Sequence, residues 1–438
     1  MRDVLIIGIV AYGCLLALRR PWIGVMLWTW LSVMSPHRYA YGFAYDAPLA
    51  AVAAVCTLLG LLMASDQRES PWKGAPVVLF AMLTVWITAS WLLGLDTEGD
   101  YGQWNKVMKV NFMLLVSLAL LHSKQHIFGL VWVAAGSLAL LGAKGGPFTV
   151  ISGGSYRVWG PEGSFIEDNN EFALALVMTI PLLRFLQMQM SNGLARHGMT
   201  LLMLLVAAAA LGSHSRGGLL AISAMSLVLW WRGRNRGVGG VVIILAAMGL
   251  VAFMPQEWSD RMNSISDYEQ DNSTLGRFSA WWVAFGVAKS HFFGAGFNLA
   301  RPDLFALYSP YFAGMGGTHA AHSIYFQILG NHGFIGLALF LLIGVTTFRW
   351  AARIRREARD IPEARWCVDL AGMCQVAMVG YGVGGAFLSL AYFDLPYIIM
   401  VLVVLTRVWV SSRAWEREPV YAPGWRTLPG LVLAKQAR

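Results

Sequence analysis

The chain has 438 residues, of which 57% are hydrophobic and only 13% are charged. A soluble globular chain carries roughly 25% charged residues, so the composition excludes an ordinary soluble protein and favours a helical membrane protein. The formal net charge of +9 reflects where basic residues lie along the chain, as described below, and we predict no nucleic-acid partner. The four cysteines lie in apolar segments without a metal-ligand spacing.

Apolar runs of about 15–20 residues follow one another with short polar breaks, and each is long enough to cross the hydrocarbon core of a bilayer. The predicted spans are residues 4–18, 22–35, 48–64, 75–94, 107–121, 127–143, 170–187, 198–211, 217–231, 238–254, 323–347, 366–390 and 397–410. The first two are short and would form a single hairpin in an alternative count of twelve. The sequence therefore predicts an all-α, polytopic transmembrane bundle of 12–13 spans.

Lysines and arginines gather in alternate loops, which the positive-inside rule assigns to the cytoplasm. These loops include residues 349–365 and the C-terminal tail, so we predict a transmembrane domain over residues 1–411 and a cytoplasmic tail over 412–438. The outer face holds residues 36–47, 95–106, 144–169 and the largest loop, 255–321. Within that loop, residues 278–289 have the apolar stripe of a helix lying along the membrane interface.

Three basic residues mark the ends of spans on the outer face: Arg216 within Ser215-Arg216-Gly217, Arg277 after Gly276, and His322 at the head of a span. An arginine at membrane level is costly, so a partner or ligand is expected. Guanidinium groups match phosphate oxygens in bidentate geometry, and a neutral imidazole accepts a proton near pH 7. Two arginines beside a histidine would suit a diphosphate leaving group and a general base.

Each of these residues also has a purely structural interpretation. Arg216 would snorkel at a helix end, Arg277 would pair with acids in residues 267–271, and His322 would bond to the backbone at a helix start. His319 and His322 are three residues apart, which is also a metal-ligand spacing on a helix. No carboxylate or cysteine completes that set, and we predict no metal.

The acidic run at residues 167–171 precedes a predicted span. We expect Asn169 or Asn170 to cap that helix, with the nearby carboxylates favoured by its N-terminal dipole. In the functional interpretation, Glu167 or Asp168 orients a sugar hydroxyl or assists the base. Outer-face cations that would hold phosphates, or pair with nearby acids, are Lys106, Lys109, Lys144 and Arg157. No nucleotide-binding or dinucleotide-binding motif is present, and we predict no cofactor.

His322-Ser323, followed after nine residues by Gly333-Phe334-Ile335-Gly336, resembles the signature of bacterial O-antigen ligases, in the O-antigen ligase and polymerase superfamily. That signature is His, then Asn, Ser or Gln, nine residues, Gly, two residues, and Gly, Thr or Tyr. The surroundings of Arg216 and Arg277 are similar to the two arginine positions of this family. Residues 18–25 and 156–170 are similar to the branch of O-glycosylation ligases associated with exosortases.

The resemblance implies a GT-C-like glycosyltransferase of the bacterial inner membrane, with about twelve spans and a large periplasmic loop. It implies transfer of a glycan from undecaprenyl diphosphate to the lipid A core oligosaccharide, without metal, with Arg216 and Arg277 on the diphosphate and His322 as base. The exosortase-associated branch leaves the acceptor open. An O-antigen polymerase and a protein O-oligosaccharyltransferase are alternative enzymes. A transporter of lipid-linked glycans is the non-enzymatic alternative, although charges within the spans are nearly absent.

Overall fold

The computed structural model describes residues 1–63, 68–233, 236–256, 258, 272–312 and 317–418. These residues form helices, turns and loops, and none of the described residues lies in a β-strand. The helices, in chain order, are α1 (Arg2–Arg19), α2 (Pro21–Met34), η1 (Pro36–Tyr39), α3 (Leu49–Met63), α4 (Ala75–Leu92), α5 (Thr97–Leu120), α6 (Lys124–Ile151), α7 (Asn169–Met188), α8 (Gly193–Gly212), α9 (Arg216–Arg232), α10 (Arg236–Phe253), α12 (Asn272–Ser290), α13 (Pro302–Tyr308), α15 (Ile324–Glu357), η3 (Pro362–Ala364), α16 (Arg365–Gly384), η4 (Gly385–Phe387), α17 (Asp394–Ser411) and η5 (Ala414–Glu416).

Every predicted span overlaps one of these helices, which confirms an all-α polytopic membrane protein. Within the described residues, seven helical segments are long and apolar enough to cross a membrane: α4, α6, α7, α8, α15, α16 with its flanking turns, and α17. Three shorter apolar helices are α2, α3 and the first part of α10. The full count of twelve or thirteen spans stays a prediction.

Two segments expected to be outer loops, residues 95–106 and 144–169, are partly helical. Residues 95–106 contribute the start of α5, because Asp96 caps that helix by accepting a hydrogen bond from Gly99 N at 3.0 Å. Residues 144–151 continue α6. Gly145 and Gly146 do not form a turn there; a Cβ at Gly146 would lie 2.4 Å from the carbonyl oxygen of Leu205. The glycine pair therefore permits close contact between α6 and α8, as small residues do between membrane helices.

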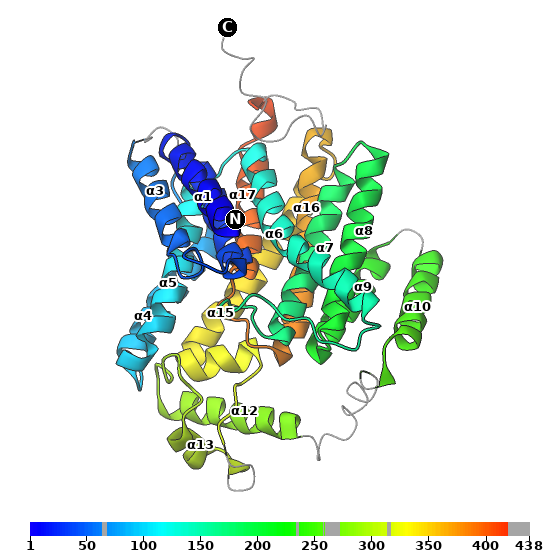
Figure 1. Ribbon diagram of the computed structural model, residues 1–438. Helices are drawn as coiled ribbons and strands as arrows, with labels where there is room; N and C mark the ends of the chain where they lie inside the picture. Colours follow the sequence, from blue (N-terminus) through cyan, green and yellow to red (C-terminus); the bar gives the residue numbers. More distant parts are fainter. Residues whose placement is uncertain (64–67, 234–235, 257, 259–271, 313–316, 419–438) are drawn as a thin grey trace.

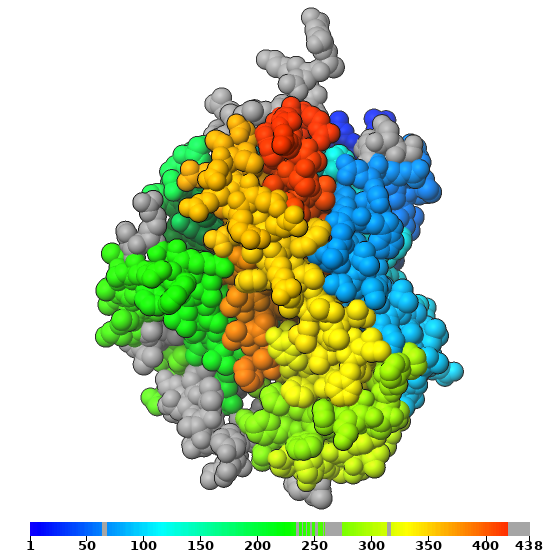
Figure 2. Space-filling model, turned by 180° about the vertical axis from the view of Figure 1, so that it is seen from behind, coloured from blue at the N-terminus to red at the C-terminus, as the bar shows by residue number. Residues whose placement is uncertain are grey.

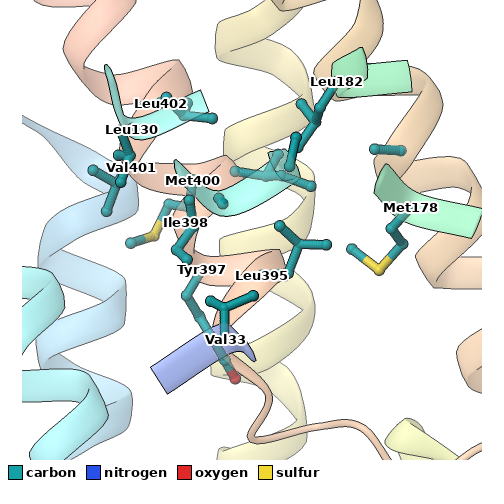
Figure 3. Close-up of a cluster of buried hydrophobic side chains, with 14 of the residues drawn as sticks. Val33, Leu130, Met178, Leu182, Leu395, Tyr397, Ile398, Met400, Val401 and Leu402 are labelled. Atoms are coloured by element: carbon teal, nitrogen blue, oxygen red, sulfur yellow. The ribbon is translucent and has the colours of Figure 1, made fainter. Parts of the chain in front are cut away.

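Helices α7 and α17 lie at the centre of the bundle. The most apolar windows of α7 and α17 are 83% and 78% buried, as expected for helices that are apolar on all sides. Figure 3 shows Ile398, Val401 and Leu402 of α17 among side chains from neighbouring helices, including Met178 of α7 and Leu130 of α6. Because lipid is as apolar as these side chains, close van der Waals packing stabilises the bundle more than exclusion from water does.

Helices α12 and α13 lie across one end of the bundle, opposite the end of α17 (Figure 1), and the region of α12 lies beneath α15 when seen from behind (Figure 2). They share a small core of their own that includes Val283, Val287 and Phe305. Trp281 of α12 stacks on Phe326 of α15 with ring centroids 4.7 Å apart. The expected helix at residues 278–289 is confirmed, and it is fixed to the start of α15.

Candidate active site

Three helices begin together at the end of the bundle that α12 covers. A Cβ at Gly218 would lie 2.8 Å from the Cβ of Ala173, so the first turns of α9 and α7 are in contact. His322 Nδ1, just before α15, lies 3.9 Å from Oε1 of Glu171 in the first turn of α7. The free backbone N–H groups and helix dipoles at such ends favour an anionic ligand.

The start of α9 places Arg216 at this end. Ser215 caps the helix by accepting a hydrogen bond from Gly218 N at 3.0 Å. Gly217 leaves room for Leu388, whose Cγ would lie 3.1 Å from a Cβ at that position. The two glycines after Arg216 thus allow α9 to begin against α7 and the loop before α17.

His322 has a strained backbone, with φ at +41°. Few residues other than glycine adopt this left-handed region, and such strain is concentrated at functional sites. The main chain is held from α12, because Trp281 Nε1 donates to the carbonyl oxygen of Ala321 at 2.7 Å. The imidazole is 35% exposed, so a substrate can reach it.

A pair of carboxyl groups, Asp168 and Glu171, lies beside this imidazole. Glu171 is 6% exposed and its Oε1 accepts a hydrogen bond from Ser389 N at 3.1 Å. Burial alone would raise the pKa of Asp168, but hydrogen bonds from Glu171 and Asn170 lower that pKa below its usual value. Two neighbouring carboxyl groups resist double ionisation, so a state with one proton and one negative charge on the pair is favoured.

The electrostatic environment keeps His322 neutral. Burial lowers the pKa of His322 below its usual value of 6.5, and the positive charge of Arg277 lowers it further. Asp168 acts in the opposite direction, and His319 adds a further lowering effect. At pH 7 the ring is therefore able to accept a proton.

Gly276 explains how Arg277 and His319 come together. A Cβ at Gly276 would lie 2.9 Å from Nδ1 of His319, so the imidazole of His319 packs against α12 beside Arg277. Arg277, His319 and His322 are thus brought close together. The glycine before the arginine provides the space.

Asp168, rather than Asn169 or Asn170, caps α7. Its carboxylate accepts a hydrogen bond from Asn170 N at 2.8 Å, so the expected asparagine cap is wrong. Asn169 instead donates from Nδ2 to the carbonyl oxygen of Ser213 at 2.6 Å, which ties α7 to the turn before α9. Glu167 is exposed and accepts a hydrogen bond from Gly163 N at 2.8 Å, within its own loop.

The additional outer-face cations have other contacts or lie in solvent. Lys106 Nζ donates to the carbonyl oxygen of Gly163 at 3.2 Å and lies 4.0 Å from the ring centre of Phe165. Lys144 lies 4.7 Å from the ring centre of Tyr39. The exposed residues in this group are Lys109, Lys144 and Arg157. A phosphate-binding role for them stays a prediction.

Glu171 is the residue that sequence reasoning left out of the site. The pattern Asp168-x-x-Glu171 is that of a capping box, in which the acidic residue bonds back to the backbone at the cap. Here its Oε1 instead accepts from Ser389 N and faces His322. One feature of the sequence could have identified Glu171 as a site residue: it is an acidic residue one turn inside an apolar span, and ionisable residues within spans are commonly functional.

Gly333, the first glycine of the His-Ser motif, breaks α15 with φ +67° and ψ −172°. The carbonyl oxygens of Gly330 and Asn331 are thereby freed, and they accept hydrogen bonds from Ala295 N and Gly296 N, both at 2.9 Å. A Cβ at Gly333 would lie 2.5 Å from the carbonyl oxygen of Phe292. The segment after α12 is therefore fixed to α15, so Arg277 and His322 belong to one connected unit.

Two segments of the chain match known protein families. Residues 201–341 match the family described as O-Antigen ligase, a range that includes Arg216, Arg277 and His322. Residues 1–191 match a family of unknown function, a range that includes Asp168 and Glu171. No curated protein matches the chain. Residues 201–341 are thus similar to the O-antigen ligase family, in agreement with the motif around His322, Arg216 and Arg277.

Proposed function

We propose that the protein is an O-antigen ligase that transfers a glycan from undecaprenyl diphosphate to the lipid A core oligosaccharide. The acceptor hydroxyl oxygen attacks the anomeric carbon, and the bond from that carbon to the diphosphate oxygen breaks. The diphosphate leaves with the electron pair, and the hydroxyl proton passes to His322. A single in-line displacement inverts the anomeric carbon.

The observation that carries the proposal is a neutral imidazole held between a carboxyl pair and a cation. Nδ1 of His322 faces Glu171 at 3.9 Å, which leaves Nε2 for the acceptor hydroxyl. As the ring takes up the proton, the single negative charge of Asp168 and Glu171 stabilises the imidazolium. Glu171 is thus a positioning residue and His322 the catalytic base.

Arg216 and Arg277 neutralise the diphosphate in this proposal. Both lie at the end of the bundle where α7, α9 and α15 begin, so helix dipoles add to their positive charge. Guanidinium groups stay charged at any working pH, and each can donate two parallel hydrogen bonds to phosphate oxygens. A diphosphate neutralised in this way leaves without a metal ion, so transfer should persist in excess EDTA.

The proposed orientation places this end of the bundle in the periplasm. The arginine-rich end of α15 and the start of α16 lie at the opposite end, near the end of α17 (Figure 1). Single cysteines in α12 and α13 should be labelled from outside intact inner membrane, and cysteines at residues 353–363 should be protected. The reverse pattern would contradict the periplasmic site.

The test of function is reconstitution of the purified protein with lipid-linked glycan and lipid A core. A ligase yields a core-linked product with the glycan length of the donor, whereas a polymerase yields longer lipid-linked glycans without core. A protein O-oligosaccharyltransferase would need a polypeptide acceptor. A transporter would move the donor across proteoliposomes and form no new glycosidic bond. Loss of activity in EDTA, restored by a divalent ion, would refute the arginine-based mechanism.

A further inference from the structure

Two arginines meet at the end of the bundle opposite the candidate active site. Arg232, the last residue of α9, donates from Nη2 to Oε1 of Gln375 at 3.1 Å. Arg355, in the last turn of α15, donates from Nη1 to the same oxygen at 3.1 Å. Gln375 is 1% exposed and its Nε2 donates to the carbonyl oxygen of Phe348 at 3.1 Å. A fixed, buried amide oxygen therefore holds two guanidinium groups together.

Among the described residues, no carboxylate balances the positive charges of Arg232 and Arg355. None of the ion pairs formed there involves Arg232 or Arg355. Glu357, close to Arg355 in sequence, pairs with Arg353 and Arg407 instead. A helix C-terminus favours one cation, but that effect does not explain why two cations from different helices share one neutral oxygen.

The surroundings of Arg232 place the pair at a membrane interface. Trp231 is 66% exposed on the bundle surface, and the Arg236 guanidinium lies 5.2 Å from the centre of its ring. Exposed tryptophans beside basic residues are typical of the level at which lipid headgroups lie. Arg232 Nη1 also donates to the carbonyl oxygen of Gly372 at 3.5 Å, and a Cβ at Gly372 would lie 3.8 Å from Nε of Arg355, so both guanidinium groups lie against α16.

We propose that Arg232 and Arg355, joined through Gln375, bind the phosphate of an anionic lipid headgroup. Two guanidinium forks present several donors to phosphate oxygens, and a phosphate balances both charges. The lipid would join α9, α15 and α16 at the end remote from His322. The site does not depend on the transfer reaction proposed above.

The test uses the full-length protein, purified and stripped of lipid in detergent. Its melting temperature is measured against added dioleoylphosphatidylglycerol, dioleoylphosphatidylcholine or inorganic phosphate. Phosphatidylglycerol should stabilise the wild type most, and the R232Q/R355Q variant should need about ten-fold or more of it for the same rise. The matched control is Arg353→Gln, which removes a nearby exposed arginine and should respond like the wild type.

A second variant tests the site even if the double variant fails to fold. Gln375→Glu places a carboxylate between the two arginines, so it should raise the melting temperature without lipid and abolish the response to phosphatidylglycerol. Equal stabilisation by inorganic phosphate, lost in R232Q/R355Q, would overturn the lipid as the source of the anion. Equal lipid responses of the wild type, R232Q/R355Q and Gln375→Glu would overturn the site itself.

Discussion

Replacing both carboxyl groups beside His322 by amides should slow transfer strongly while leaving the fold intact. In the D168N/E171Q variant, the asparagine introduced at the first position can still cap α7, because asparagine caps helices as well as aspartate does. The glutamine introduced at the second position keeps an oxygen that can accept from Ser389 N, which in the wild type bonds to Glu171 at 3.1 Å. The variant therefore removes the negative charge of the pair and little else.

The size of the effect follows from the distance between the imidazole and the carboxyl group. A negative charge on Glu171, 3.9 Å from the imidazole, would be worth about 4 kcal/mol at an effective dielectric of 20, and the charge on Asp168, which lies farther from the ring, is worth less. The greater distance of Asp168 and the partial exposure of His322 weaken this interaction to roughly 2–3 kcal/mol. We predict a fall in kcat of roughly 10²-fold, with donor affinity nearly unchanged.

Single variants sharpen this prediction, measured as rates of core-linked product over a range of pH. Glu171→Gln leaves the charge on Asp168 and should cost less than the double variant. Asp168→Asn moves the charge onto Glu171, nearer the imidazole, and should shift the acid limb of the pH profile upward. A double variant with the wild-type rate and pH profile would refute the role of the carboxyl pair.

Three further predictions concern the cations, the pH dependence and the kink. Arg277→Ala and Arg216→Ala should each lower kcat/KM by an amount corresponding to about 2–4 kcal/mol, and substitution by lysine should restore activity only in part. Full activity in either alanine variant would mean that the arginine only snorkels and does not bind the diphosphate. Because burial and Arg277 lower the pKa of His322, the rate should stay nearly constant from pH 8 to 6.5 and fall only at lower pH; in Arg277→Gln the residual rate should begin to fall at higher pH. Gly333→Ala should lower both the melting temperature and activity, since φ is +67° and Phe292 O blocks a Cβ, whereas Gly344→Ala, which has open space around it, should lower neither.

The positions of the helices along the chain were predictable because apolar length alone identifies membrane helices. Chain order also identified Arg216, Arg277 and His322 as residues at one face. The capping residue of α7 could not be predicted from the sequence, because Asp168, Asn169 and Asn170 are all good capping residues and local geometry selects among them. Gly145 and Gly146 were interpreted as a loop, since tight helix contact and turns both use glycine.

The role of Glu171 depends on long-range contacts that the sequence does not reveal. Its partners are Ser389, on the loop before α17, and His322, just before α15. Both are far from it in the chain, so no local pattern distinguishes this carboxylate from the second half of a capping box. The same reason conceals the meeting of Arg232 and Arg355, which only tertiary packing brings together.

The central claim is that His322 acts on the acceptor rather than on the donor diphosphate. The most direct measurement compares single-turnover transfer and donor binding in wild type, His322→Ala and His319→Ala. We predict that His322→Ala lowers the transfer rate by ~10²–10⁴-fold with donor affinity largely intact, and that His319→Ala has a milder effect. A collapse of donor affinity in His322→Ala, or transfer at the wild-type rate, would contradict the account.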